Sequence, residues 1–81
     1  MLDELKSAKE KLVGSKQVLK AIRTGELKRV YLAEDADKGL FEQVFSAAKE
    51  QGIECVFIPS KEELGKACGI QVKAACAALK K

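Results

Sequence analysis

Hydrophobic positions along the chain follow two spacings in turn, and this alternation predicts helices and strands that succeed one another. Apolar residues recur at helical intervals at Leu40, Val44 and Ala48, which indicates an amphipathic helix. The run Val30–Ala33 is apolar and suited to a sheet, which indicates a buried strand. By these criteria we expect helices over residues 2–10, 16–24, 40–51 and 61–68, and strands over residues 11–13, 29–33, 53–58 and 73–79.

Residues that start and stop regular structure mark the ends of several of these elements. Gly14 ends the first strand, and Ser15 is expected to cap the helix that follows it. Ser60 and Glu63 form a capping box at the start of the last helix. The alanines of residues 73–79 favour helix as well as strand. The alternation as a whole predicts an α/β fold with helices on both faces of a small sheet.

The length and composition indicate one small folded domain. The 81 residues leave no room for a second core, so residues 1–81 are expected to form a single domain. The composition is 47% hydrophobic and 33% charged, as is usual for a globular protein. No apolar run approaches the roughly 18 residues of a membrane span, and the first residues lack the features of a signal peptide. We therefore expect a cytoplasmic monomer with no membrane partner.

The residue types present argue against catalysis and metal binding. The chain contains no histidine, so neither a Ser-His or Cys-His pair nor a histidine-containing zinc site can form. Its three cysteines, Cys55, Cys68 and Cys76, lack the spacing of a zinc site or a disulfide set. We expect them to be reduced, with Cys55 and Cys76 buried as small apolar side chains. No catalytic residue, metal or cofactor is predicted.

Charge is divided unevenly along the chain. Residues 1–33 carry eight basic and four acidic side chains, and residues 61–81 carry five lysines and two glutamates. The intervening residues 34–60 carry two lysines and six acidic side chains. If the two basic segments come together in the fold, they form a basic face that suits a polyanion. The alternative is that these charges only solvate the surface.

The helix expected after Gly14 separates basic from apolar side chains. At about 100° per residue, Lys16, Lys20 and Arg23 lie within about 60° of one another, and Gln17 lies beside them. The apolar residues of this segment lie on the opposite side. Lysine and glutamine at the start of a helix can contact phosphates and base edges. A solvated amphipathic helix would show the same periodicity.

Three blocks of sequence are distinctive enough to compare with known families. They are Gly-Ser-Lys-Gln-Val-Leu-Lys at residues 14–20, Ala-Glu-Asp-Ala-Asp at residues 33–37, and Pro-Ser-Lys-Glu-Glu-Leu-Gly-Lys-Ala-Cys-Gly-Ile at residues 59–70. With them, nearly all of the chain resembles the ribosomal-protein L7Ae family of kink-turn RNA-binding proteins, especially its short bacterial members. The resemblance implies a three-layer α/β/α sandwich with a small mixed sheet.

The resemblance also implies where RNA would bind. In that family, the helix after the glycine turn enters the widened groove of a kinked RNA, where its side chains meet the guanines of tandem sheared G·A pairs. Asp37 matches an acidic position that contacts a flipped-out nucleotide, Lys61 matches a backbone contact, and residues 70–73 match a loop that packs on exposed bases. Together with the basic helix face, this gives as candidate RNA-binding residues Gly14, Ser15, Lys16, Gln17, Lys20, Arg23, Asp37, Lys61, Ile70, Gln71, Val72 and Lys73.

Some of these positions depart from the family or have another explanation. Archaeal and eukaryotic relatives usually have Asn and Glu where this chain has Lys16 and Gln17, so this helix is more cationic. Asp37 can instead cap the helix that follows it. Ile70 and Val72 either face solvent, where they can cover splayed bases, or belong to the core.

The predicted function is non-enzymatic recognition and stabilisation of kink-turns in structured RNA, either ribosomal RNA or a regulatory leader. The protein is then expected in the cytoplasm, free or associated with the ribosome. The competing hypothesis is a protein-interaction module on the same fold, since a fold does not determine its function. Only the RNA-binding hypothesis requires basic side chains to converge on one face of the protein, so their position discriminates between the two hypotheses. Those side chains are Lys16, Lys20, Arg23, Lys61 and Lys73.

Overall fold

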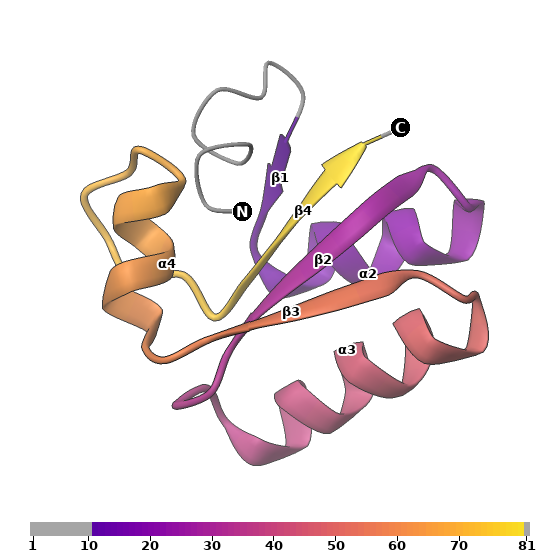
Figure 1. Ribbon diagram of the computed structural model, residues 1–81, viewed down its shortest axis with the longest axis horizontal. Helices are drawn as coiled ribbons and strands as arrows, with labels where there is room; N and C mark the ends of the chain where they lie inside the picture. Colours follow the sequence, from indigo (N-terminus) through magenta and orange to yellow (C-terminus); the bar gives the residue numbers. More distant parts are fainter. Residues whose placement is uncertain (1–10, 81) are drawn as a thin grey trace.

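Helices and strands alternate along residues 11–80, the part of the chain that this computed structural model describes (Figure 1). The helix expected over residues 2–10 lies outside the described residues. Within residues 11–80, no helix has the length and apolar character needed to cross a membrane. The elements are β1 (Lys11–Val13), α2 (Ser15–Thr24), β2 (Leu27–Ala33), α3 (Lys38–Glu50), β3 (Glu54–Ile58), α4 (Lys61–Ala67) and β4 (Cys76–Lys80).

The strands form one mixed sheet in the order β1-β4-β2-β3. β4 is antiparallel to both of its neighbours, whereas β2 and β3 are parallel. Val13 of β1 pairs with Ala77 of β4, and Leu32 of β2 pairs with Cys76. The carboxyl ends of β1, β2 and β3 therefore lie beside the amino end of β4. We call this the loop end of the sheet, and each described helix begins there.

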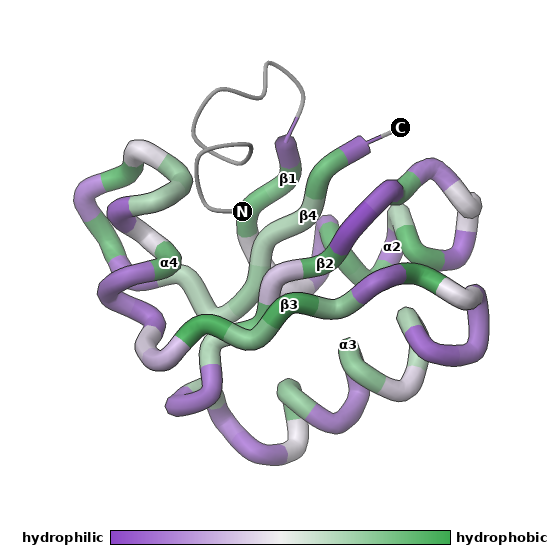
Figure 2. The backbone as a smooth tube through the Cα atoms, in the orientation of Figure 1, coloured by the Kyte–Doolittle hydropathy of each residue, from purple (hydrophilic) through white to green (hydrophobic). Residues whose placement is uncertain are grey.

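Helices cover both faces of the sheet, as the α/β alternation predicts. On one face, Val18 of α2 and Val44 of α3 pack with Val30 of β2. On the other face, Leu64 of α4 packs with Tyr31 of β2. All five side chains are fully buried, which stabilises the fold by roughly 1.5–3 kcal/mol for each. The result is the expected three-layer α/β/α sandwich, and in Figure 2 its strands are mostly hydrophobic.

Several predicted boundaries differ from the structure, and β2 and α3 begin earlier than expected, at Leu27 and Lys38. Two others are wrong at the loop end, for different reasons. Gly14 rather than Ser15 is the N-cap of α2, and Ser15 is the first helical residue. The backbone of Gly14 has φ 110, a conformation that glycine adopts readily and serine does not. The last strand begins at Cys76 rather than at residue 73. Its expected first residues are held elsewhere, because the Ala74 N–H donates to the Lys61 carbonyl at 3.1 Å.

The start of α4 agrees with the capping prediction. The Ser60 hydroxyl oxygen accepts a hydrogen bond from the Glu63 N–H at 3.1 Å. Such a cap contributes about 1 kcal/mol, which matters for a helix of only seven residues. The capping pair therefore fixes where α4 begins at the loop end.

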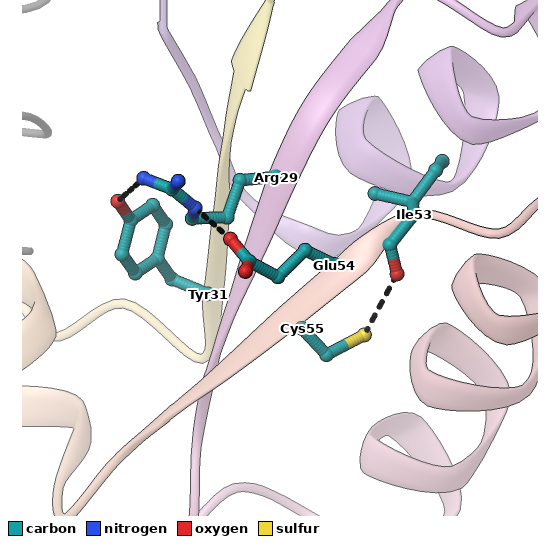
Figure 3. Close-up of polar contacts among 5 residues, drawn as sticks. All are labelled: Arg29, Tyr31, Ile53, Glu54 and Cys55. Carbon is teal, nitrogen blue, oxygen red and sulfur yellow. Dashed lines mark hydrogen bonds and ion pairs between the residues drawn. The ribbon is translucent and has the colours of Figure 1, made fainter.

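Polar contacts accompany the parallel pairing of β2 with β3 (Figure 3). Arg29 and Glu54 pair in the register of the sheet, and their side chains form an ion pair. The Arg29 guanidinium also donates to the Tyr31 hydroxyl at 3.4 Å. These contacts join the two strands on the α4 face of the sheet, so they help to hold β3 at its edge position.

The three cysteines are free thiols with different degrees of burial. Cys76 is fully buried, and this burial raises the pKa of its thiol to about 11. The expectation that Cys76 is buried is therefore confirmed. The same expectation for Cys55 is wrong, because β3 is an edge strand and leaves Cys55 half-buried. Burial and the neighbouring Glu54 carboxylate both raise the pKa of Cys55.

Candidate nucleic-acid interface

Backbone hydrogen bonds join segments that are far apart in the sequence at the loop end of the sheet. The Gly14 N–H donates to the Cys76 carbonyl at 3.1 Å, which ties the start of α2 to β4. The Ala33 N–H donates to the Ala75 carbonyl at 3.0 Å, which ties the end of β2 to the segment before β4. The segment before β4 is thus held between α2 and the end of β2.

The start of α4 joins the same set of segments. The Lys61 carbonyl accepts from the Ala74 N–H, and the Lys61 N–H donates to a carboxylate oxygen of Asp35 at 2.7 Å. One residue of α4 therefore contacts both the segment before β4 and the loop after β2. Both contacts involve the Lys61 backbone, and no contact of its ammonium group is described within residues 11–80.

The start of α2 presents amide groups together with polar side chains. The first helical hydrogen bond runs from the Val18 N–H to the Gly14 carbonyl at 3.1 Å, and no side chain of residues 11–80 caps this end. The preceding helical N–H groups are those of Ser15, Lys16 and Gln17, and the latter two side chains are exposed. Unpaired amides and the helix dipole favour an anion or an electronegative base edge at this position.

The segment 70–73 forms an exposed loop over α4. The Val72 side chain is 69% exposed, and Gln71 and Lys73 are exposed as well. Ile70 is half-buried and packs against the core, and its N–H donates to the Gly65 carbonyl at 3.1 Å. The sequence left open whether Ile70 and Val72 face solvent or belong to the core. In the structure Val72 faces solvent, whereas Ile70 belongs partly to the core.

A hollow of about 600 Å³ lies between this loop and α4. Its walls come from the loop residues 70–73 and from Glu62 and Lys66 of α4. These two side chains form an exposed ion pair at 3.6 Å. The hollow therefore offers apolar surface from Val72 beside groups that can form hydrogen bonds.

Asp37 caps α3 at the loop end. One of its carboxylate oxygens accepts from the Leu40 N–H at 3.1 Å, so the capping interpretation is confirmed. The Asp37 side chain is nevertheless exposed, and its second oxygen has no partner among the hydrogen bonds described for residues 11–80. Its contact with a nucleotide stays a prediction.

Comparison with known proteins places the chain in a family. The sequence profile described as the Ribosomal protein L7Ae/L30e/S12e/Gadd45 family matches residues 1–81. The chain belongs to this family. An RNA-binding protein of Bacillus pumilus is 38% identical over 77 residues, with 95% of this chain and 94% of the relative covered. The RNA-binding protein YbxF of Geobacillus stearothermophilus is 43% identical over 68 residues, with 84% and 83% covered.

A solved structure shows the same fold. The Giardia lamblia 15.5kD RNA binding protein superimposes with a TM-score of 0.87 at 30% identity. The match covers 99% of this chain and 68% of the Giardia chain. The L7Ae-family fold is therefore confirmed for this chain.

Not all candidate residues of this L7Ae-family member lie at the loop end. Lys16 and Gln17 begin α2, whereas Arg23 lies in its last turn. Arg23 lies seven positions after Lys16, a rise of about 10 Å along the helix. Lys20 lies between them and lines a hollow of about 270 Å³ together with Gln17. The basic stripe of α2 thus leads away from the loop end, with Arg23 as its most distant member.

Two residues of the site escaped the sequence analysis. Asp35 holds the start of α4 through its bond to the Lys61 N–H, a contact across 26 positions that no local pattern reveals. Gly65 lies under the exposed loop, where a β-carbon would be 3.2 Å from the carbonyl carbon of Val72 and closer still to its oxygen. A glycine inside a predicted helix was the available signal for such a close approach.

The described residues offer no metal centre. Within residues 11–80, no group of three or more His, Cys, Asp or Glu side chains is placed to hold a metal ion. The candidate site is instead built from exposed lysines, helix amides, an amide side chain and an apolar loop. These groups suit binding of a large anionic ligand.

Proposed function

We propose that this L7Ae-family protein binds RNA without catalysing a reaction, and that it recognises a kink-turn through the loop end of its sheet. The observation that carries the proposal is the set of backbone hydrogen bonds that brings α2, Lys61 and the segment before β4 together. The relatives named as RNA-binding proteins support it as well. We further propose a cytoplasmic location and ribosomal or regulatory RNA as the target.

The start of α2 would supply base recognition. Lys16 can donate to guanine O6 and N7, and the Gln17 amide can both donate and accept. Both side chains are exposed beside unpaired helix amides, so they can reach the floor of a widened groove. A kink-turn provides that width, whereas the deep major groove of a regular RNA helix does not admit side chains.

Lys61 and the loop 70–73 would hold the other side of the bend. The Lys61 and Lys73 ammonium groups suit phosphates, and the exposed Val72 can cover the face of an unstacked base. The position of Lys73 beside Val72 lets one loop contact base and backbone together. Lys16 and Lys61 lie at the starts of two helices that begin at the loop end. A protein-interaction module would not need cations at both starts, which favours RNA.

The decisive experiment is titration of the protein with a kink-turn RNA and with a fully paired control RNA across a salt series. We expect much tighter binding to the kink-turn at every salt concentration, because shape as well as charge contributes. Equal affinity for the two RNAs would contradict kink-turn recognition and would leave only a basic surface.

Two variants separate the proposed roles. Gln17→Ala should lose on the order of 1–3 kcal/mol on the kink-turn and almost nothing on the paired RNA, because it removes a base contact. Lys61→Ala should weaken binding to both RNAs about equally and reduce the salt dependence by roughly one phosphate contact. If both variants behave alike, base and backbone recognition are not divided in this way.

A further inference from the structure

The three phenylalanines of the chain gather where α3 meets β3, with Phe41 and Phe45 half-buried against the core and Phe57 exposed. Phe41 and Phe45 lie one turn apart on α3, and Phe57 lies on β3. The ring centroids of Phe57 are 5.7 Å from those of both Phe41 and Phe45, and the latter two are 6.3 Å apart. We call these three rings the phenylalanine cluster. Phe57 is 45% exposed, which is unusual for the largest apolar side chains in so small a protein.

The cluster borders an unpaired edge of the sheet. β3 is an end strand, and no strand of residues 11–80 pairs with its outer side. The Ile58 carbonyl accepts from the Glu34 N–H at 2.7 Å, so it points toward the β2 side. Since backbone groups alternate in direction along a strand, the N–H and carbonyl groups of Cys55 and Phe57 point outward. An extended segment could pair with these groups, as in strand addition.

The surroundings of the cluster favour a basic ligand. A hollow of about 440 Å³ adjoins Phe41 and is lined by Glu34 and Glu42, with Lys38 and Ala36 completing it. Aromatic faces attract cations, and the Lys49 ammonium already lies 5.9 Å from the Phe45 ring centroid. Two glutamates against one lysine disfavour RNA here. A second copy of the chain would bring its own residues 34–60, which carry the same excess of acidic side chains.

We propose that the β3 edge and the phenylalanine cluster bind an extended segment of another protein in which basic and apolar side chains alternate. Its backbone pairs with Cys55 and Phe57 of β3. The basic side chains, which all lie on one face of that segment, then meet the aromatic rings of the phenylalanine cluster and the hollow beside Glu42. This second binding surface shares no residue with the one proposed for RNA, although its hollow adjoins Asp37 in the loop after β2.

The probe is a short synthetic peptide of alternating arginine and valine, titrated into the ¹⁵N-labelled protein and followed by amide chemical shifts. We expect saturable shifts centred on residues 55–57 and on the α3 turns that carry Phe41 and Phe45. A peptide with glutamate in place of arginine should cause no such shifts. An arginine–valine peptide with N-methylated backbone amides should also fail, because it cannot pair with a strand edge.

Variants at the two large exposed apolar residues of the described chain provide a matched control. Phe57→Ser and Glu42→Lys should each weaken peptide binding by about tenfold or more, while Val72→Ser leaves it unchanged. Conversely, Phe57→Ser should leave the affinity for kink-turn RNA unchanged. Glu42→Lys tests the same surface without altering apolar packing. It therefore still tests peptide binding at this surface if Phe57→Ser fails to fold.

Three results would overturn the proposal. One is peptide-induced shifts on α2 and the loop 70–73 instead of β3, or equal shifts with the glutamate peptide. Another is a loss of RNA affinity in both Phe57→Ser and Glu42→Lys, which would assign the face to RNA. The last is a dimer of the free protein, in sedimentation equilibrium, that Phe57→Ser dissociates, which would assign the face to a second copy.

Discussion

Replacing Gly65 by alanine should destabilise the protein, although alanine favours helix. Gly65 is buried in α4 where the loop 70–73 crosses the helix. A β-carbon there would be 3.4 Å from the Lys73 α-carbon, 3.2 Å from the Val72 carbonyl carbon and in overlap with the Val72 oxygen. These are backbone atoms, so no side-chain rotation relieves the overlap, and the loop as a whole must move.

The expected free energy change combines two opposing effects. Gly→Ala inside a helix stabilises by up to about 1 kcal/mol. Forcing an extra carbon into a packed position costs about 1–3 kcal/mol, and here the Ile70 N–H bond to the Gly65 carbonyl is strained as well. We therefore expect Gly65→Ala to lower the free energy of unfolding by about 1–2 kcal/mol. The displaced loop should also weaken RNA binding by roughly tenfold, equal to about 1.4 kcal/mol.

Urea denaturation and titration with kink-turn RNA would measure the two effects. The matched control is Gly39→Ala near the start of α3, where a β-carbon would approach only a carboxylate oxygen of Asp37, at 3.3 Å. The same oxygen caps α3 through the Leu40 N–H, so displacing it would cost up to about 1 kcal/mol. Alanine gains about as much in helix propensity, so we expect the control to stay within about 0.5 kcal/mol of the wild type. If Gly65→Ala is as stable as the wild type and binds RNA equally well, the close approach to Gly65 does not fix the position of the loop 70–73.

Two further predictions concern the cap of α3 and the buried thiol. Asp37→Ala should lower the free energy of unfolding by about 1 kcal/mol, whereas Asp37→Ser should keep most of the cap, and an RNA contact of the carboxylate would appear as weaker binding in both variants. Because burial raises the pKa of Cys76 from 9.0 to about 11, the unfolded chain loses its proton first as the pH rises. The free energy of unfolding should therefore fall by up to about 1.4 kcal/mol per pH unit between pH 9 and pH 11. Urea midpoints at pH 8 and pH 10 measure this loss, which should be smaller in Cys76→Ala.

Local patterns in the sequence predicted the helices and strands of residues 11–80 well, because each apolar face has a core to meet. Leu40, Val44 and Ala48 do lie on one side of α3 against the sheet. Strand order was beyond such patterns, since nothing local places β4 between β1 and β2. The misplaced start of β4 has the same origin, because residue 74 is held by Lys61 from another element.

Some features of the candidate site could likewise be predicted from the local sequence, and others could not. Exposure of Lys16 and Gln17 followed from the periodicity of α2, and the capping role of Asp37 was one of two open alternatives. The roles of Asp35 and Gly65 depend on backbone atoms of distant segments, so only the fold reveals them. The phenylalanine cluster does have a local pattern, but the spacing of Phe41 and Phe45 on α3 is that of an ordinary core stripe, so the sequence does not single it out.

The interior position of β4 has a consequence for the synthesis of the protein. β4 is the last described strand to leave the ribosome, yet it separates β1 from β2, and β1 has no other neighbour among the described strands. β1 cannot pair in the sheet, and the segment before β4 cannot dock at its end, until β4 up to residue 80 has emerged. Contacts between the two ends of a chain form slowly, because a long loop must close first. The hydrogen bonds that tie Gly14 to Cys76 and Ala33 to Ala75 must therefore wait for β4, so this part of the loop end forms last.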